Sequence, residues 1–132
     1  MREILFRAKR EYNKGWIEGS YIRSAFEKSR IGYIAPNWSE KLATILTATL
    51  GQYTGLKDKN GKKIFEGDIV KTSKFNTPNK KYIIKFDLQF GAFIGQDKDD
   101  MYFTTFDGDS DQFEVIGNIH DNPELLKEVK QG

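Results

Sequence analysis

The stretch that decides the fold is Gly51–Val70, which reads GQYTGLKDKNGKKIFEGDIV. Near its centre Asn60-Gly61 stands between lysines, with apolar residues further out on both sides. Asparagine and glycine adopt positive φ at the least steric cost, so this pair predicts a type I′ turn. We therefore expect a hairpin in which Leu50–Leu56 and Lys63–Lys71 are the two strands.

Two further features of this stretch are predicted to shape its backbone. Gly67 interrupts the second strand, and a glycine inside a strand usually marks a bulge or a sharp bend. We expect the neighbouring Asp68 to stabilise that bend with its side chain, and Asp58 to accept hydrogen bonds from amides of the loop. A structural role in turns is therefore predicted for Asn60, Gly61, Gly67 and Asp68.

A phosphate-binding loop is the alternative interpretation of the same residues. A Walker A loop needs four residues between its glycines, followed by Lys and then Ser or Thr. Here five residues separate Gly55 from Gly61, and Lys63 stands where the hydroxyl is required. The spacing and the missing hydroxyl exclude a nucleotide-binding loop of this class.

Three segments of the chain share their pattern with a known family. They are the stretch Gly51–Val70, the opening segment Ile4–Ala8, and the closing motif VIGNIHDNPELL at Val115–Leu126. Together they resemble the YopX family, whose members are of unknown function and occur mainly in phages and prophages of low-GC Gram-positive bacteria. The resemblance implies one YopX-like domain over residues 1–132 and a phage or prophage origin. It supplies no catalytic residue.

The length and composition favour a small domain rich in strands. A chain of 132 residues is long enough for one hydrophobic core. It has no cysteine, which excludes disulfide and thiolate chemistry and fits the cytoplasm of a bacterial host. No apolar run reaches the length of a membrane span, so no membrane contact is expected. Ten Phe, six Tyr and twelve Gly favour many short strands.

Alternating apolar residues locate the other strands. Ile4–Lys9 and Trp16–Ile22 predict an N-terminal hairpin, and Lys81–Phe90 alternates most cleanly of all. Further strands are expected at Ala43–Leu50, Met101–Phe106 and Phe113–Ile119. A short C-terminal helix is predicted over Pro123–Val129, because Asn122-Pro123-Glu124 has the form of an N-cap, an N1 proline and an acid in the first turn.

The predicted fold is therefore mainly β. We expect a small, strongly bent sheet or an SH3-like barrel, with the N-terminal hairpin at one end of the chain and the short helix at the other. The SH3-like part is an analogy drawn from the strand opening Gly67-Asp68-Ile69-Val70, and an analogy of fold says little about function.

No constellation in the sequence indicates catalysis or a cofactor. Asp107, Asp109 and Asp111 alternate as calcium ligands do, but the sixth and twelfth positions of an EF-hand loop hold Gln112 and Asn118 instead of Gly and Glu. We expect a solvated acidic loop that binds no metal. His120 is the only histidine, and no serine or cysteine nucleophile can be paired with it by motif. The protein is predicted not to be an enzyme.

Basic residues interspersed with aromatics keep one binding function open. Cations and aromatic rings at the rim of a small β domain can bind single-stranded nucleic acid through charge and stacking. Lysines on exposed strand edges also discourage aggregation, which explains them without any ligand. The candidate contacts to nucleic acid or another partner are Lys57, Lys59, Lys62, Lys63, Lys80 and Lys81.

The net charge of +2 is unevenly distributed along the chain. Residues 57–85 hold nine basic and three acidic residues, whereas residues 86–132 hold three basic and eleven acidic ones. Such asymmetry lets opposite charges meet between copies of the chain. We therefore predict a non-enzymatic interaction module that forms a homo-oligomer. The alternative is an accessory protein that binds nucleic acid weakly and without sequence preference.

Overall fold

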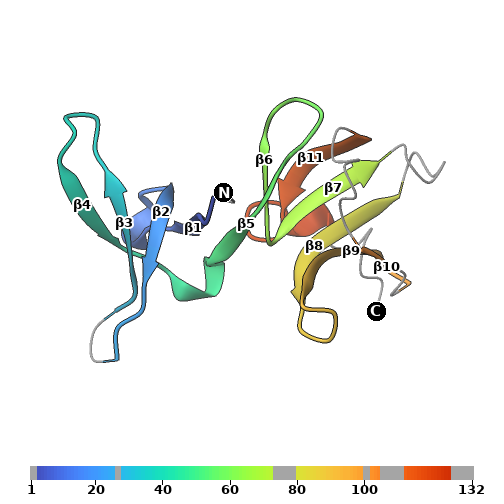
Figure 1. Ribbon diagram of the computed structural model, residues 1–132, viewed down its shortest axis with the longest axis horizontal. Coiled ribbons are helices and arrows are strands. Elements are labelled where there is room, and N and C mark those ends of the chain that lie inside the picture. The colour runs from blue at the N-terminus through green and yellow to red at the C-terminus, as the bar shows by residue number, and fades with distance from the viewer. Residues whose placement is uncertain (1–2, 26–27, 73–79, 100–101, 105–111, 126–132) are drawn as a thin grey trace. The chain divides into compact units, whose positions relative to one another are not determined.

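The computed structural model describes residues 3–25, 28–72, 80–99, 102–104 and 112–125 (Figure 1). The chain divides into two compact units, residues 1–53 and 54–132. Each unit is built from antiparallel strands joined by tight turns and short 3-10 segments. The prediction of a mainly β fold is confirmed.

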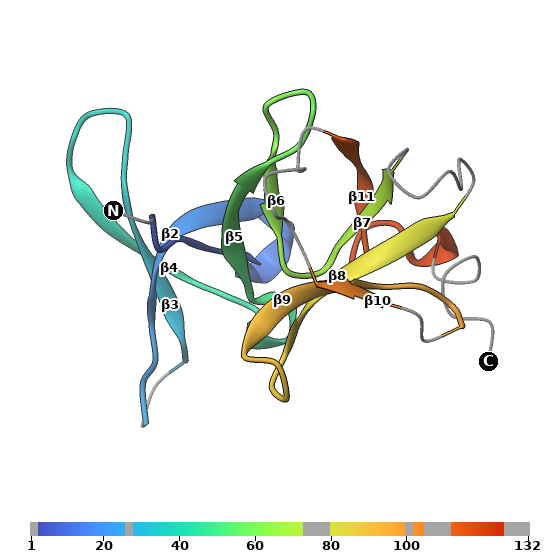
Figure 2. The same cartoon turned by 45° about the vertical axis from the view of Figure 1, so that its right-hand side comes forward.

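The N-terminal unit contains an antiparallel meander in which each strand pairs with the next along the chain (Figure 2). Its strands are β1 (Phe6–Lys9), β2 (Trp16–Ile22), β3 (Arg30–Ile34) and β4 (Glu40–Thr44). Strand β5 (Gly51–Lys57) pairs with β1 through its first two residues and then continues into the second unit. The pairing of β1 with β2 confirms the predicted N-terminal hairpin.

The strand predicted at Ala43–Leu50 is wrong in its position. Strand β4 ends at Thr44, and a 3-10 turn, η2 (Thr47–Thr49), lies within the expected strand. The Thr49 hydroxyl donates to the Leu46 carbonyl oxygen at 2.6 Å and accepts the Lys9 amide at 2.8 Å. This side chain therefore offers the backbone hydrogen bonds that compete with a strand ladder.

One face of the N-terminal meander carries the hydrophobic core of its unit. Ala8, Ile31 and Ile45 are buried there. Phe6 and Tyr21 pack against them, with ring centroids 5.7 Å apart. Because side chains alternate between the faces of a strand, the neighbouring residues point to the opposite, outer face of the meander.

The C-terminal unit holds a five-stranded antiparallel sheet with the strand order β10-β9-β8-β7-β11. These strands are β7 (Asp68–Thr72), β8 (Lys81–Asp87), β9 (Ala92–Gln96), β10 (Tyr102–Thr104) and β11 (Phe113–Asn118). Strand β6 (Lys63–Phe65) pairs with β5. The core of this unit contains Ile64, Val70, Tyr82, Ile84 and Phe113 on one side, and Ile69 with Ile83 in a second cluster.

The loop between β5 and β6 differs from the predicted type I′ turn. Gly61 has φ +80°, but Asn60 lies outside the positive-φ region, so only one of the two residues adopts the geometry that type I′ requires. The Gly61 amide donates to the Asp58 carbonyl oxygen at 3.0 Å, and the Asp58 amide to the Lys62 carbonyl oxygen at 2.7 Å. The Asp58 carboxylate accepts the amides of Asn60 and Lys62, and these bonds hold a wider loop than the sequence predicts.

The bend between β6 and β7 lies where the sequence predicts it. Gly67 has φ +91°, a conformation that side chains disfavour. The Asp68 carboxylate, which is 1% exposed, accepts the Phe65 amide at 2.7 Å across the bend. Asp68 thus makes a side-chain hydrogen bond across the bend of the kind that the sequence predicts.

One finer prediction about the fold, the closed barrel, is wrong, and another, the C-terminal helix, is not confirmed. The described strands form two antiparallel sheets and no closed barrel, because β10 and β11 end the five-stranded sheet without meeting. Of the helix predicted over Pro123–Val129, the structure describes only the first three residues, which form a 3-10 turn, η4 (Pro123–Leu125). Asn122 does not act as a helix cap there: its Oδ1 accepts the Asn118 amide of β11 at 3.1 Å.

Candidate functional site

The candidate site lies on the outer face of the N-terminal meander, opposite its core. Ser20 of β2 pairs with Gly32 of β3, and Gly32 pairs with Leu42 of β4. Residues that face each other across antiparallel strands point to the same side, so these three residues form one row. Ile22 and Ile34 stand two positions along their strands on the same face.

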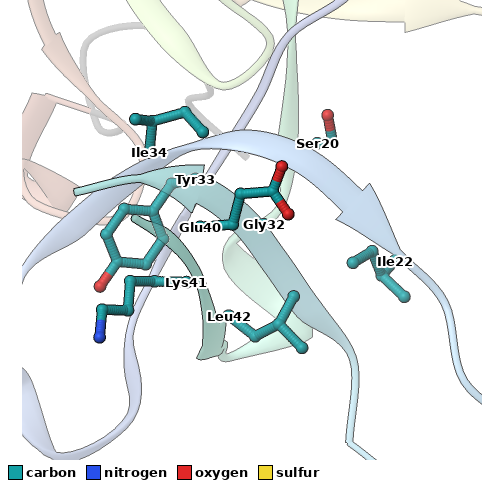
Figure 3. Close-up of a pocket in the computed structure, with 8 residues that line it drawn as sticks. All are labelled: Ser20, Ile22, Gly32, Tyr33, Ile34, Glu40, Lys41 and Leu42. Carbon is teal, nitrogen blue, oxygen red and sulfur yellow. The ribbon is translucent and has the colours of Figure 1, made fainter. Parts of the chain in front are cut away.

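This row forms the floor of an open hollow of about 560 Å³ (Figure 3). The residues that line the hollow are Ser20, Ile22, Gly32, Tyr33, Ile34, Glu40, Lys41 and Leu42. A Cβ placed on Gly32 would lie 3.6 Å from both Ile22 Cδ1 and Leu42 Cδ2. The hollow exists because a glycine and a serine occupy its centre while larger apolar residues stand beside them.

The walls of the hollow expose apolar side chains to solvent. Ile34 and Leu42 are each 57% exposed, and Ile22 is 42% exposed. Strand β4 also ends its sheet, and within the described ranges no strand pairs with its outer edge. Contiguous exposed apolar surface and open strand edges are both typical of protein interaction sites.

The turn between β3 and β4 adds an exposed tryptophan. Trp38 is 85% exposed and has φ +66°, which is unusual for a bulky residue. The turn is closed by hydrogen bonds between Ala35 and its neighbours: the Trp38 amide donates to the Ala35 carbonyl oxygen, and the Ala35 amide to that of Ser39. Backbone strain of this kind persists where the surrounding structure enforces it, often at functional sites.

A second, smaller hollow of about 310 Å³ lies at the β1–β2 turn. Tyr12 and Asn13, with φ 61° and 56°, form the turn there. Glu11 in its lining pairs with Lys28, and the hydrogen bond to Glu11 raises the pKa of Lys28 above its ordinary value. This hollow is more polar than the first, and its acidic group is already paired with a lysine.

The structure places the predicted lysine contacts in two groups. Lys57, Lys59, Lys62 and Lys63 gather around the β5–β6 loop, and Lys80 and Lys81 lie at the start of β8. Lys59 Nζ is 3.8 Å from Glu114 Oε1. Lys80 Nζ is 2.8 Å from Asp97 Oδ2, and this hydrogen bond raises the pKa of Lys80. Part of the basic charge is therefore used within the C-terminal unit.

The ring of Trp16 already contacts cationic side chains of its own unit. Arg7 and Lys9 of β1 lie 4.8 Å and 5.7 Å from the centroid of the Trp16 ring on β2. These are cation–π distances. A nucleic-acid base that stacked on this ring would have to displace these side chains.

Asp107, Asp109 and Asp111 lie outside the described residues, and within these no group of three potential metal ligands occurs. Asp97 Oδ1 accepts the Asp99 amide at 2.9 Å in a turn. No helix of the described residues has the length and apolarity needed to cross a bilayer.

The hollow was not predicted from the sequence. One signal was available: Arg30–Ile34 and Glu40–Thr44 carry apolar residues at both odd and even positions. A strand with one face on a core and one in water shows apolar residues at alternate positions only. Two neighbouring strands with apolar residues on both faces therefore indicate a second apolar surface.

Comparisons with known proteins identify a family and a solved structure with a similar fold. Residues 5–127 match the family model described as YopX protein. The crystal structure of protein EF1440 from Enterococcus faecalis is similar, with 26% sequence identity and a TM-score of 0.59. The similarity covers 96% of this chain and 99% of that one. Among curated proteins none matches.

Proposed function

This chain belongs to the YopX family, and we propose that it is a non-enzymatic interaction module that associates with copies of itself. The family resemblance supports a phage or prophage origin, with the protein acting in the cytoplasm of the bacterial host. The observation that best supports self-association is the apolar hollow on the outer face of β2, β3 and β4.

Burial of this hollow would supply the free energy for association. Full burial of one isoleucine or leucine side chain stabilises a protein by about 1.5–3 kcal/mol. Ile34 and Leu42 are each more than half exposed, so much of this contribution is still available to a partner. Glu40 pairs with Ile34 on the same face and adds a charged group beside the apolar side chains, as the polar rim of an interface does.

The first test of self-association is a charge placed in the hollow. We expect wild-type protein to show a concentration-dependent mass above 15.2 kDa in light scattering. Leu42→Lys should reduce the mass towards that of a single chain, because a buried unpaired charge is costly. Leu46→Lys is the matched control: Leu46 is 45% exposed, lies outside the hollow, and its replacement adds the same charge.

Two results would count against the proposal. Wild-type protein with the mass of a single chain at every concentration would end it. If Leu42→Lys and Leu46→Lys have the same mass in light scattering, the hollow is not the surface through which the copies associate. A circular dichroism spectrum of Leu42→Lys that differs from wild type would attribute any loss to unfolding, and Ile34→Lys would then replace it.

Nucleic-acid binding is a second candidate function, supported by the four lysines around the β5–β6 loop. We expect weak binding to single-stranded DNA or RNA, with no preference for sequence and strong dependence on salt. A plot of the logarithm of the binding constant against the logarithm of salt concentration has a negative slope. Reversing the charges of Lys62 and Lys63 should make this slope less steep by about 1.4. Filter binding over a salt series measures this, with Lys41→Glu as the control. Tight binding that persists at high salt would contradict it.

A further inference from the structure

The C-terminal unit exposes a group of apolar side chains at the turn between β8 and β9. Leu88 is 91% exposed and Phe90 is 48% exposed, the former being one of the most exposed apolar residues in the described part of the chain. Phe86, at the end of β8, is 38% exposed and packs edge-to-face on Phe93 at 5.1 Å. We call residues 86–90 the apolar turn.

Hydrogen bonds fix the backbone of the apolar turn. Asp87 Oδ1 accepts the amides of Gln89 at 2.8 Å and Phe90 at 3.0 Å. The Gly91 amide donates to the Asp87 carbonyl oxygen at 2.8 Å, and Gly91 has φ +64°. Leu88 therefore projects from a preorganised turn, so little conformational entropy would be lost if it entered a binding site.

The apolar turn and the hollow have complementary shapes. The hollow is concave, with glycine at its floor and apolar residues at its walls, and two hollows cannot fill each other. The apolar turn projects apolar side chains, which would fill the space above the glycine in the hollow. At about 560 Å³ the hollow has the size of a small-molecule pocket, which accommodates a leucine side chain and part of a phenylalanine.

The charges of the two units are complementary as well. Residues 1–53, which contain the hollow, hold nine basic and five acidic residues, a net charge of +4. Residues 54–132, which contain the apolar turn, hold twelve basic and fourteen acidic residues, a net charge of −2. Opposite net charges favour an encounter between unlike units of two copies over an encounter between like units.

We propose that the apolar turn of one copy binds in the hollow of a second copy, with Leu88 beside Gly32. This inference rests on the self-association proposed above and specifies its geometry. The contact joins two different surfaces, so each copy offers one hollow and one turn. Such contacts propagate head to tail and end in a closed ring or continue as a filament.

The decisive experiment uses two variants, each lacking one half of the contact. Leu42→Lys damages the hollow and keeps the turn, whereas Leu88→Lys damages the turn and keeps the hollow. We expect each variant alone to have the mass of a single chain. An equimolar mixture should form a pair of two chains and grow no further, because only one intact hollow and one intact turn meet. Leu46→Lys should assemble as wild type does.

A milder substitution and a salt series measure the two components of the contact separately. Leu88→Ala should weaken association by at least about tenfold, because most of a leucine side chain is lost from the hollow. Its 91% exposure means that this substitution leaves the fold intact. Raising the salt concentration should weaken wild-type association, since the charge attraction between unlike units is screened.

The outcomes distinguish this inference from the proposed function. If wild-type protein never associates, both fail. If wild-type protein associates and Leu88→Lys does so equally well, self-association stands and the apolar turn is not its partner. If the two variants are each single chains and their mixture stays so, the contact is not between these surfaces. If Trp38→Ala no longer associates while Leu88→Ala associates as wild type does, the exposed tryptophan is the anchor of the contact and the proposal is overturned.

Discussion

Replacement of Gly19 by alanine is expected to lower the free energy of unfolding of the N-terminal unit by about 3 kcal/mol. A Cβ at this position would lie 2.0 Å from the Gly32 carbonyl oxygen and 2.8 Å from Ile31 Cγ2. The nearest atom belongs to the backbone, so no side-chain rotation relieves the overlap. Strands β2 and β3 would have to separate, which weakens the pairing that forms the hollow.

Gly32→Ala is the matched control for this substitution. It also adds one methyl group to a strand glycine, but its Cβ would meet its neighbours only at 3.6 Å or more. We expect little change in stability. Urea denaturation of the two variants beside wild type measures the difference. Equal stability of Gly19→Ala and Gly32→Ala would contradict the close approach of β2 and β3 at Gly19.

The second large effect is expected at Asp58, whose carboxylate joins two distant parts of the C-terminal unit. Its Oδ1 accepts the Asn60 and Lys62 amides of the loop, and its Oδ2 accepts the Val115 amide of β11 at 3.0 Å. Asp58→Asn replaces one acceptor by an NH₂ group, which would face a backbone N–H. The expected cost is about 3 kcal/mol, because a buried donor loses its partner.

The pH dependence of this effect follows from the pKa of Asp58. Burial raises the pKa, but the hydrogen bonds from the amides of Val115, Lys62 and Asn60 outweigh burial and hold it below its ordinary value. A carboxyl group with a lowered pKa stabilises the folded state above the unfolded pKa of about 4, and this contribution is lost as the pH falls through the folded pKa. The stability difference between wild type and Asp58→Asn should therefore be largest near neutral pH and shrink in acid.

Urea denaturation between pH 7 and pH 3 tests this dependence. Asp87→Asn is the control, because Asp87 also accepts two amides but only from its own turn. At pH 7 its effect should be near 1 kcal/mol, the typical net contribution of an exposed hydrogen bond. A constant difference between wild type and Asp58→Asn over the whole range would contradict the assigned role of the carboxylate.

Several strands could be predicted from the sequence with bounds close to those of the structure, whereas strand β3 could not. Trp16–Ile22 was predicted with the bounds that the structure gives, and the strand predicted at Phe113–Ile119 ends one residue later than β11. Strand β3 was missed, because Arg30–Ile34 has apolar residues towards both the core and the hollow. Periodicity detects the contrast between faces, so it gives no signal where both faces are apolar.

Local hydrogen bonds were predictable, and bonds between distant residues were not. The bonds from the Asp58 carboxylate to loop amides follow from its position beside a turn. Its bond to Val115 depends on how β11 meets the loop, which no local pattern encodes. The hollow has the same origin: Ser20, Gly32 and Leu42 lie in one row only because of the register of three strands. The SH3-like analogy failed because Gly67-Asp68 specifies a bend and does not determine whether a sheet closes.

The placement of the two tryptophans gives the protein an optical label for one of its units. Trp16 and Trp38 are the only tryptophans in the chain, and both belong to residues 1–53. Indole emission excited at long wavelength therefore reports on the N-terminal unit alone, whereas far-ultraviolet circular dichroism reports on both. Trp38 is already in water, so the change in emission on unfolding comes mainly from Trp16 beside its two cations. Denaturant titrations followed by indole emission and by circular dichroism would coincide if the two units unfold together. They would differ if the N-terminal unit unfolds by itself.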